Sequence, residues 1–253
     1  MRNASATISP KEFVDTYSRV NERTSSSFSG RHVGHYKAVL ENQFLVGIHS
    51  SMMSIPYQAG FSWPRWHHVV DVMLEKDPGN PKQHRLSVIA LVESDYNQLQ
   101  RILVARPMNH HLEDKGIMLP DIQYGSRSER QCISPVLNKV LTYDLVRQTK
   151  VSGAFIENDA MGCFDRLVNT LVFLELRHLC VPLTVVQSMR MSWESASHHI
   201  KNAYGCLDTT YSISKEVPLF GPRQGSTTGP DLWGIMFRLI AKNMHVDRKM
   251  ITF

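Results

Sequence analysis

The sequence has little cysteine and no long apolar run, and each shortage excludes a class of protein. Its four cysteines lie far apart, at Cys132, Cys163, Cys180 and Cys206. None of the spacings fits a zinc site or a disulfide framework, so we expect reduced thiols in the core. No stretch reaches the roughly 18 uncharged apolar residues of a membrane span, and the N-terminus lacks the layout of a signal peptide. We therefore expect a soluble protein inside the cell, in the cytoplasm or nucleus, with no membrane partner.

Neither sign of charge dominates the chain. The 253 residues include 28 Lys and Arg against 23 Asp and Glu, which gives a formal net charge of +5. The excess is spread along the chain rather than gathered in a tail, so it permits a polyanionic partner without requiring one. With 42% hydrophobic residues, the chain has enough apolar surface for the core of one large domain or two small ones.

The spacing of apolar residues predicts helices first, then a β hairpin, then a mixed unit, which is an α+β order. Helices are expected at residues 10–23, 34–57, 93–106, 136–145, 165–179 and 184–198, and from Ser226 onward. Strands are expected at residues 69–74 and 85–91, in a segment ending at Asp159, and in a hairpin at 204–213. Ser9 should cap the first helix, and Pro107 should end the third.

Two short stretches carry most of the functional information. Residues 155–165 are an apolar run that ends in Asp159, followed by Phe164 and Asp165 at the expected start of a helix. Residues 221–230 contain a turn, Gln224-Gly225, that leads into the last helix. Taken singly, each has a purely structural explanation as an N-cap, with Asp159 or Ser226 as the capping residue. Taken together and in this order, they resemble motifs A and B in the palm of reverse transcriptases of the non-LTR retroelement kind.

Stretches upstream fit the same resemblance. The segment from Trp63 to residue 91 resembles the fingers blocks of the family. It contains Trp63-Pro64, then a strand, Lys76, a Pro/Gly turn and residues 89–91. Gln123-Tyr124-Gly125, followed by two arginines, resembles the Gln-aromatic-Gly block that precedes motif A. The order and spacing of the blocks over roughly residues 60–240 are harder to obtain by chance than any single block.

The resemblance implies an α+β fold made of the fingers and part of the palm of a right-hand polymerase. Residues 1–60 would be an N-terminal helical segment, residues 61–150 a fingers-like region and residues 151–253 a partial palm. The implied activity is that of an RNA-directed DNA polymerase, a nucleotidyltransferase that uses deoxynucleoside triphosphates to extend a DNA primer on an RNA template. In this chemistry two Mg²⁺ ions clamp the attacking and leaving oxygens of a displacement at phosphorus.

The resemblance also assigns roles to individual residues. Asp159 is the implied catalytic residue and metal ligand, and the main-chain carbonyl of Ala160 is the second oxygen that faces the metal. Phe164 would lie beneath the sugar and exclude a 2′-hydroxyl by its bulk. Gln224 and Gly225 would contact the nucleotide or the template base, because glycine lets the backbone come close to a ligand.

The fingers strand supplies two weaker candidates for contact with the nucleotide. The family places an arginine two residues before its Ile-x-Leu, and this position is Ser87 here. Arg85 lies two residues earlier and on the same face of the strand by the period of two, so it is a partial substitute. Lys76 is the better candidate, and a solvated turn lysine is an equally good explanation of it.

Several residues depart from the family's pattern, and one departure decides the expected activity. Two adjacent aspartates, which the family carries in a hairpin after motif B, occur nowhere in the chain. We therefore expect a fragment truncated before motif C that polymerises poorly, and whether the chain itself is an enzyme stays open. One alternative is a non-catalytic nucleic-acid-binding remnant. Another is an RNA polymerase or maturase relative, which should tolerate a smaller residue than Phe164.

Other residue types that often form sites fit structural roles better. The histidine pairs at residues 67–68, 110–111 and 198–199 lack metal-site spacing, so surface or loop positions are expected for them. Trp63 and Trp66 should pack in the core rather than stack on bases. The basic stretch at residues 30–37 fits a phosphate contact and the first turn of a helix equally well.

Overall fold

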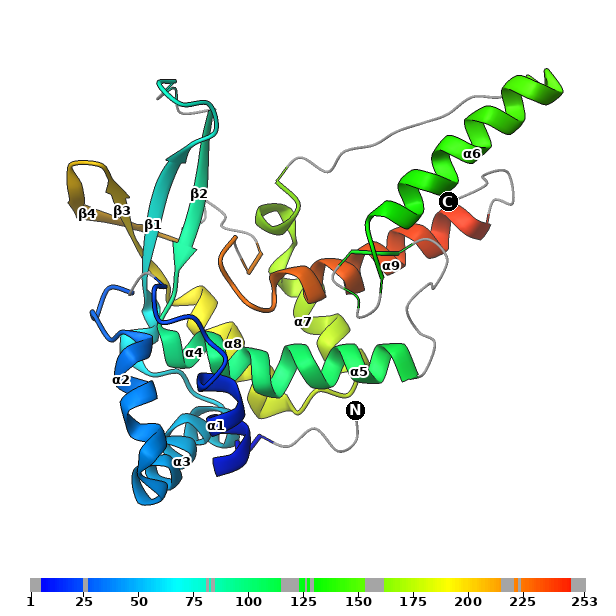
Figure 1. The fold of residues 1–253 in the computed structure, drawn as a ribbon. Helices are drawn as coiled ribbons and strands as arrows, with labels where there is room; N and C mark the ends of the chain where they lie inside the picture. The colour runs from blue at the N-terminus through cyan, green and yellow to red at the C-terminus, as the bar shows by residue number, and fades with distance from the viewer. Residues whose placement is uncertain are drawn as a thin grey trace.

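The protein has a mixed α+β fold, in which a small sheet rises from a base of helices (Figure 1). The structure is a computed structural model. It describes residues 6–24, 27–80, 82, 85–114, 123–125, 127, 130–152, 162–214, 221–222 and 224–246. The α+β fold class predicted from the sequence is confirmed at this level.

The sheet has four strands in the order β2-β1-β3-β4. The strands are β1 (His68–Glu75), β2 (Leu86–Leu91), β3 (Ser197–Asn202) and β4 (Gly205–Ser212). β1 is antiparallel to β2 and parallel to β3, and β3 is antiparallel to β4. The first hairpin agrees with the prediction. The second begins earlier than expected, because residues at 197–202 pair with β1 instead of continuing the preceding helix.

Helices form the base and one flank of the molecule. The α-helices are α1 (Pro10–Tyr17), α2 (Val33–Ala38), α3 (Gln43–Ala59), α4 (Ser94–Gln100), α5 (Arg106–Asp114), α6 (Ile133–Thr149), α7 (Asn169–His178), α8 (Leu183–Glu194) and α9 (Gly229–Val246). The shorter elements are the 3₁₀ helices η1 (Val39–Glu41), η2 (Pro64–His67) and η5 (Phe164–Arg166) and the π-helical segment η4 (Arg101–Ala105). The Ser9 cap of α1 is confirmed, because Glu12 N donates to Ser9 Oγ and Ser9 N donates to the Glu12 carboxylate.

The long amphipathic helix predicted at residues 34–57 is broken, and the face expected to pack is exposed. Asn42 starts α3 by accepting hydrogen bonds from the amides of the next turn at 3.1 Å. Phe44, Ile48 and Met52 lie on the exposed side of α3. The buried side consists of Val46, Ser50, Met53, Ser54, Pro56 and Tyr57. The prediction was wrong because the core packs against the face that carries Val46, Met53 and Tyr57, together with two serines, and not against the face that carries Phe44, Ile48 and Met52.

Pro107 does not end the helix that begins near Glu93. The chain runs from α4 through η4 into α5, and Arg106 N donates to the carbonyl of Arg101 in the wider π turn. Proline has no N–H to donate, and in a regular α-helix its ring clashes with the carbonyl four residues earlier, that of Leu103. The wider turn is a known way for a helix to absorb such a local disruption, so the helix continues.

One hydrophobic core joins the N-terminal helices, α4, η4 and α5, and the C-terminal helices. Its largest fully buried side chains include Phe13, Tyr17, Tyr57, Trp66, Leu99, Met108, Leu176, Met189 and Leu232. The expected core position of Trp66 is confirmed. The cysteines were placed wrongly, because Cys132, Cys180 and Cys206 are exposed and only Cys163 is half-buried. No helix in the described ranges is long and apolar enough to cross a membrane.

The pairing of β1 with β3 buries a polar cluster that was expected at the surface. His198 is 1% exposed, and its Nδ1 lies 3.0 Å from Asp71 Oδ2 on β1. Tyr211 on β4 donates to the same carboxylate oxygen. His199 is also buried, and its Nε2 lies 3.1 Å from His68 Nδ1. The parallel pairing of two strands far apart in the sequence puts these histidines inside, which local pattern does not predict.

Candidate functional site

The described residues around the two motifs form a set of contacts centred on the Gln224-Gly225 turn, called the loop below. Asp159 and Ala160 lie outside the residues that the structure describes. The expected strand that ends at Asp159 lies in the same undescribed range. Phe164, Gln224, Gly225, Lys76 and Arg85 are described, and their surroundings follow.

One side of the loop lies against the edge of the sheet. Ala90 N on β2 donates to the carbonyl of Gln224 at 2.7 Å. Gly225 has a φ of 120°, and a Cβ built on it would lie 2.2 Å from the carbonyl oxygen of Ala90. This φ strongly favours glycine, and the distance leaves no room for a side chain. The loop therefore covers part of the free edge of β2, with its backbone in direct contact with the strand.

The other side of the loop segment contacts the end of the 155–165 stretch and the start of α7. Gly221 has a φ of 73°, and a Cβ on it would lie 1.6 Å from the carbonyl oxygen of Phe164. Gly221 N donates to Asn169 Oδ1, at the start of α7, at 2.8 Å. The backbone of Phe164 is thereby fixed against the chain that enters the loop. The structure thus brings the described end of the 155–165 stretch against the 221–230 stretch.

A pocket of about 250 Å³ lies on the Phe164 side of the loop. It is lined by Gln123, Tyr124, Gly125, Phe164, Pro230, Trp233, Gly234 and Phe237. The Gln-aromatic-Gly block, the motif A aromatic and the helix behind motif B therefore share one pocket. Gln123 is 6% exposed, and its Oε1 accepts no hydrogen bond from any residue in the described ranges. The pocket is somewhat smaller than the roughly 300–1,000 Å³ of typical ligand sites.

Two residues of α4 hold the loop in place, and sequence reasoning missed both. Asn97 Nδ2 donates to the Gly225 carbonyl at 3.2 Å, and Asn97 Oδ1 accepts from Thr227 N at 2.8 Å. Gln100 Oε1 accepts from Ser226 Oγ at 3.1 Å. An asparagine and a glutamine in a helix give no sequence signal for such a role. Their partners lie more than a hundred residues away along the chain.

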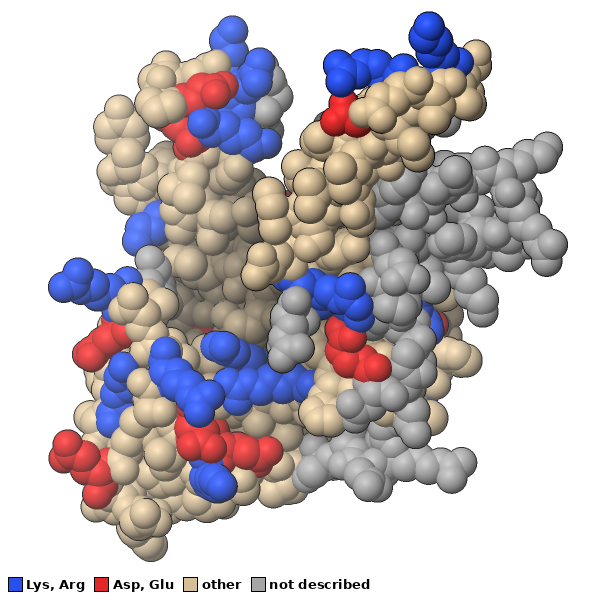
Figure 2. Space-filling view, turned by 45° about the vertical axis from the view of Figure 1, so that its right-hand side comes forward, with Lys and Arg blue, Asp and Glu red and all other residues tan. Residues whose placement is uncertain are grey.

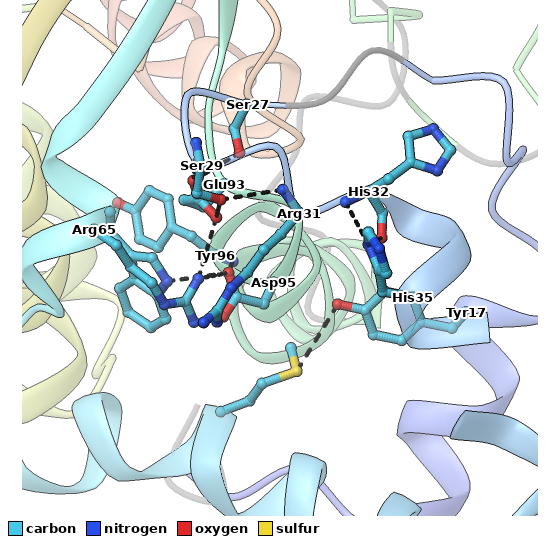
Figure 3. A network of polar contacts seen from close by, with 12 residues as sticks. Tyr17, Ser27, Ser29, Arg31, His32, His35, Arg65, Glu93, Asp95 and Tyr96 are labelled. Atoms are coloured by element: carbon cyan, nitrogen blue, oxygen red, sulfur yellow. Dashed lines mark hydrogen bonds and ion pairs between the residues drawn. The ribbon is translucent and has the colours of Figure 1, made fainter. Parts of the chain in front are cut away.

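A buried network of charges fixes the start of α4 (Figure 3). Arg65 donates to Asp95 through both ends of its guanidinium group, and to Glu93 Oε2 at 3.2 Å. Glu93 and Asp95 are 0% and 2% exposed. Ser27 Oγ and Ser29 Oγ donate to Glu93 at 2.7 and 2.9 Å. Since Asn97 follows directly in α4, this network positions the residue that holds the loop.

Lys76 and Arg85 lie at the tip of the β1–β2 hairpin, away from the loop. Lys76 N donates to the Arg85 carbonyl at 3.0 Å, and the Arg85 guanidinium lies 3.7 Å from Asp77 with both side chains exposed. Ala90, which contacts the loop, is five residues further along the strand, roughly 17 Å at 3.3 Å per residue. The structure therefore brings neither basic side chain to Gln224 or Gly225.

Asp231 in the first turn of α9 is a titratable residue that sequence reasoning gave no role. It is 7% exposed and accepts a hydrogen bond from Asn109 on α5. Burial raises the pKa of Asp231 to about 6 from an ordinary value near 3.8, and the hydrogen bond from Asn109 opposes this rise. The signal available in the sequence was its position, seven residues after Gln224 at the start of the last helix.

The raised pKa of Asp231 predicts how stability changes with pH. Between about pH 4 and 6 the folded chain binds more protons than the unfolded chain, so the free energy of unfolding falls as pH rises through this window. Asp231→Asn keeps an acceptor for Asn109 and removes the buried charge, so it should raise the free energy of unfolding at pH 7.5 by about 1 kcal/mol. This value allows for the helix N-terminus, which favours the charged carboxylate and opposes the gain. Urea unfolding at pH 4.5 and 7.5 measures this. An equal difference from the unsubstituted chain at both pH values would contradict it.

Within the described ranges, no group of three or more His, Cys, Asp or Glu side chains is arranged to hold a metal ion. The predicted ligands Asp159 and Ala160 were not part of that search, because their positions are not described. No protein-family model matches the chain, and no curated protein sequence matches it. The function must therefore be argued from the residues and contacts of the chain itself.

Proposed function

We propose that this chain is the fingers and partial palm of a reverse transcriptase of the non-LTR retroelement kind. The observation that supports it most is the contact of the loop with β2 on one side and of Gly221 with Phe164 on the other. These three stretches resemble separate polymerase blocks in the sequence, and they lie against one another in the fold. Its partners would be an RNA template with a DNA primer and deoxynucleoside triphosphates, in the cytoplasm or nucleus.

The proposal gives each described residue a physical task. The ring of Phe164 lines the pocket, where its bulk would exclude a ribose 2′-hydroxyl while its carbonyl stays against Gly221. Gln224 and Gly225 would present backbone and amide groups to the nucleotide or template base. Gln123 Oε1, buried and without a donor among the described residues, is an acceptor suited to an N–H of the ligand.

The roles in metal and triphosphate binding fall to two other groups of residues. The first lies outside the described ranges, and the second lies far from the loop. Asp159 and the carbonyl of Ala160 would hold Mg²⁺, a hard cation that prefers oxygen ligands. The metal would supply charge neutralisation at the phosphoryl group. Lys76 and Arg85 would contact the triphosphate, a role that requires the hairpin tip to move toward the loop.

Phe164→Val tests the steric role of the ring. The smaller side chain should lower the preference for a deoxynucleotide over a ribonucleotide by about tenfold or more, since relief of a steric clash that costs the ribonucleotide about 1.4 kcal/mol is a factor of ten. The measurement is the affinity of the chain with primer–template for each type of triphosphate. Phe28→Val, an exposed aromatic outside the pocket, is the matched control and should leave the preference unchanged. An unchanged preference in Phe164→Val would remove the ring from the site.

Primer extension on an RNA template with Mg²⁺ separates catalysis from binding alone. Extension that is present in the unsubstituted chain and lost in Asp159→Ala would support the enzyme. Salt-sensitive binding without extension, unaffected by Asp159→Ala, would favour the second candidate, a non-catalytic nucleic-acid-binding remnant. The observation that favours that candidate is the excess of 28 Lys and Arg over 23 Asp and Glu, which is compatible with a polyanionic partner without any chemistry.

A further inference from the structure

Three arginines come together on the helical part of the molecule, outside the contacts described above. Arg19 follows the end of α1, Arg101 begins η4, and Arg106 begins α5. Arg19 and Arg106 are exposed, and Arg101 is half-buried. Figure 2 shows basic side chains gathered in a row across the helical part of the surface, below a hollow that separates the β hairpin from the opposite flank. We call Arg19, Arg101 and Arg106 the arginine cluster.

The π turn before Pro107 explains why Arg101 and Arg106 share a face. In a regular α-helix, residues five apart are rotated by roughly 140° relative to each other. In η4 the amide of Arg106 donates to the carbonyl of Arg101, so the two residues lie above one another. The Arg106 guanidinium also donates to Thr16 Oγ1 on α1 at 3.1 Å, which brings it next to Arg19.

The positive charge of the cluster is not neutralised by ion pairs within the described part of the chain. The arginines that form ion pairs there are Arg65, Arg85, Arg127, Arg147, Arg190 and Arg238. Burial lowers the pKa of Arg106, the charges of Arg101 and Arg19 lower it further, and Asp15 and Glu12 oppose this to a smaller extent. Three like charges held together in this way create a positive potential that favours an anion.

The cluster lies beside the loop. Arg101 is one helical turn, about 6 Å along the axis, after Asn97, which holds Gly225 and Thr227. A hollow of about 250 Å³ beside the loop is lined in part by Val20, Asn97, Gln98 and Gly225. Val20 is the neighbour of Arg19 in the chain. A strand that follows this hollow past the loop would therefore approach Arg19, the chain neighbour of the lining residue Val20.

We propose that Arg19, Arg101 and Arg106 form a phosphate site that holds the backbone of a nucleic-acid strand as it passes the loop. Guanidinium groups suit this ligand, because each presents parallel N–H donors to two phosphate oxygens. The choice of nucleic acid as the source of the phosphate rests on the proposed function. The site itself involves neither motif A nor motif B.

The test is the salt dependence of binding of a labelled DNA primer on an RNA template to the full chain. Removing one phosphate contact should reduce the steepness of the fall of log K with log salt by about 0.7–0.9, which is about a five- to eightfold loss of affinity at 0.1 M salt. We expect Arg19→Gln to show one such step and the double variant Arg101→Gln with Arg106→Gln to show two. Arg190→Gln, at an exposed arginine paired with Glu194 on α8, is the matched control and should leave the slope unchanged.

The outcomes separate this site from the proposed function. A slope unchanged in all variants, with binding intact, would overturn the arginine site alone. If free deoxynucleoside triphosphate competes with the labelled nucleic acid, and this competition is lost in the double variant, the cluster binds a triphosphate. This result would overturn the proposal that it holds a nucleic-acid strand. Absence of any nucleic-acid binding at low salt would overturn both proposals. Arg101→Lys with Arg106→Lys keeps the charges and should restore the slope. If the salt dependence of the lysine variant is as weak as that of the glutamine variants, the loss is structural, and the proposed phosphate site is overturned.

Discussion

Gly221→Ala is expected to destabilise the protein by about 3 kcal/mol or more. The new Cβ would lie 1.6 Å from the carbonyl oxygen of Phe164, so either η5 or the chain entering the loop must move. The φ of 73° adds the cost of a left-handed conformation, about 1 kcal/mol for alanine. Because backbone atoms rather than a flexible side chain block the Cβ, the clash cannot be relieved by a rotamer change. Urea unfolding monitored by tryptophan fluorescence measures the loss.

Gly79→Ala is the matched control for this substitution. Gly79 has a φ of 81°, close to that of Gly221, but no atom lies within 4 Å of its built Cβ. It should therefore lose only the conformational part, about 1 kcal/mol. The difference between the two variants isolates the contact between motif B and Phe164. Equal losses would mean that this contact does not exist. The proposed site would then lose its main support.

Arg65→Met should cost about 3–5 kcal/mol, because it leaves Glu93 and Asp95 buried without their cation. Methionine keeps most of the apolar stem, so the loss reports the charge rather than the volume. The loop should loosen as well, since the same network fixes the start of α4. Thermal unfolding measures the stability, and protease cleavage near residue 224 reports the loop.

Two comparisons check the interpretation of Arg65→Met. Arg190→Met removes an exposed partner of Glu194 and should leave the free energy of unfolding nearly unchanged. The triple variant Arg65→Met with Glu93→Gln and Asp95→Asn removes the uncompensated charge and should recover part of the loss. A triple variant less stable than Arg65→Met alone would show that the carboxylates are stabilised by other partners.

Local signals in the sequence predicted the elements that depend on local chemistry. The Ser9 cap and the β1–β2 hairpin were predicted because capping and strand alternation act within a few residues. Pro107 was misread because its local rule, which ends a helix, was overridden by the wider turn of η4. The exposed face of α3 was mispredicted because periodicity shows that a face is apolar but not what packs on it.

The contacts that build the candidate site depend on tertiary pairing, which local pattern does not encode. Asn97 and Gln100 became visible only once α4 and the loop were seen side by side. His198 and Asp71 were similarly hidden until β1 and β3 paired. The resemblance to polymerase blocks selected Phe164, Gln224 and Gly225, and their neighbours in space give each a defined environment. Its assignment of Asp159 and Ala160 stays a prediction.

The most direct test of the account is whether the next templated nucleotide traps the complex. A primer ending in a dideoxynucleotide, annealed to an RNA template, is bound to the chain with Mg²⁺ and then challenged with excess competitor. The account predicts that the complementary deoxynucleoside triphosphate slows dissociation, that a mismatched one does not, and that Gln224→Ala weakens the effect. Dissociation at the same rate with matched and mismatched nucleotides would contradict the reverse transcriptase assignment.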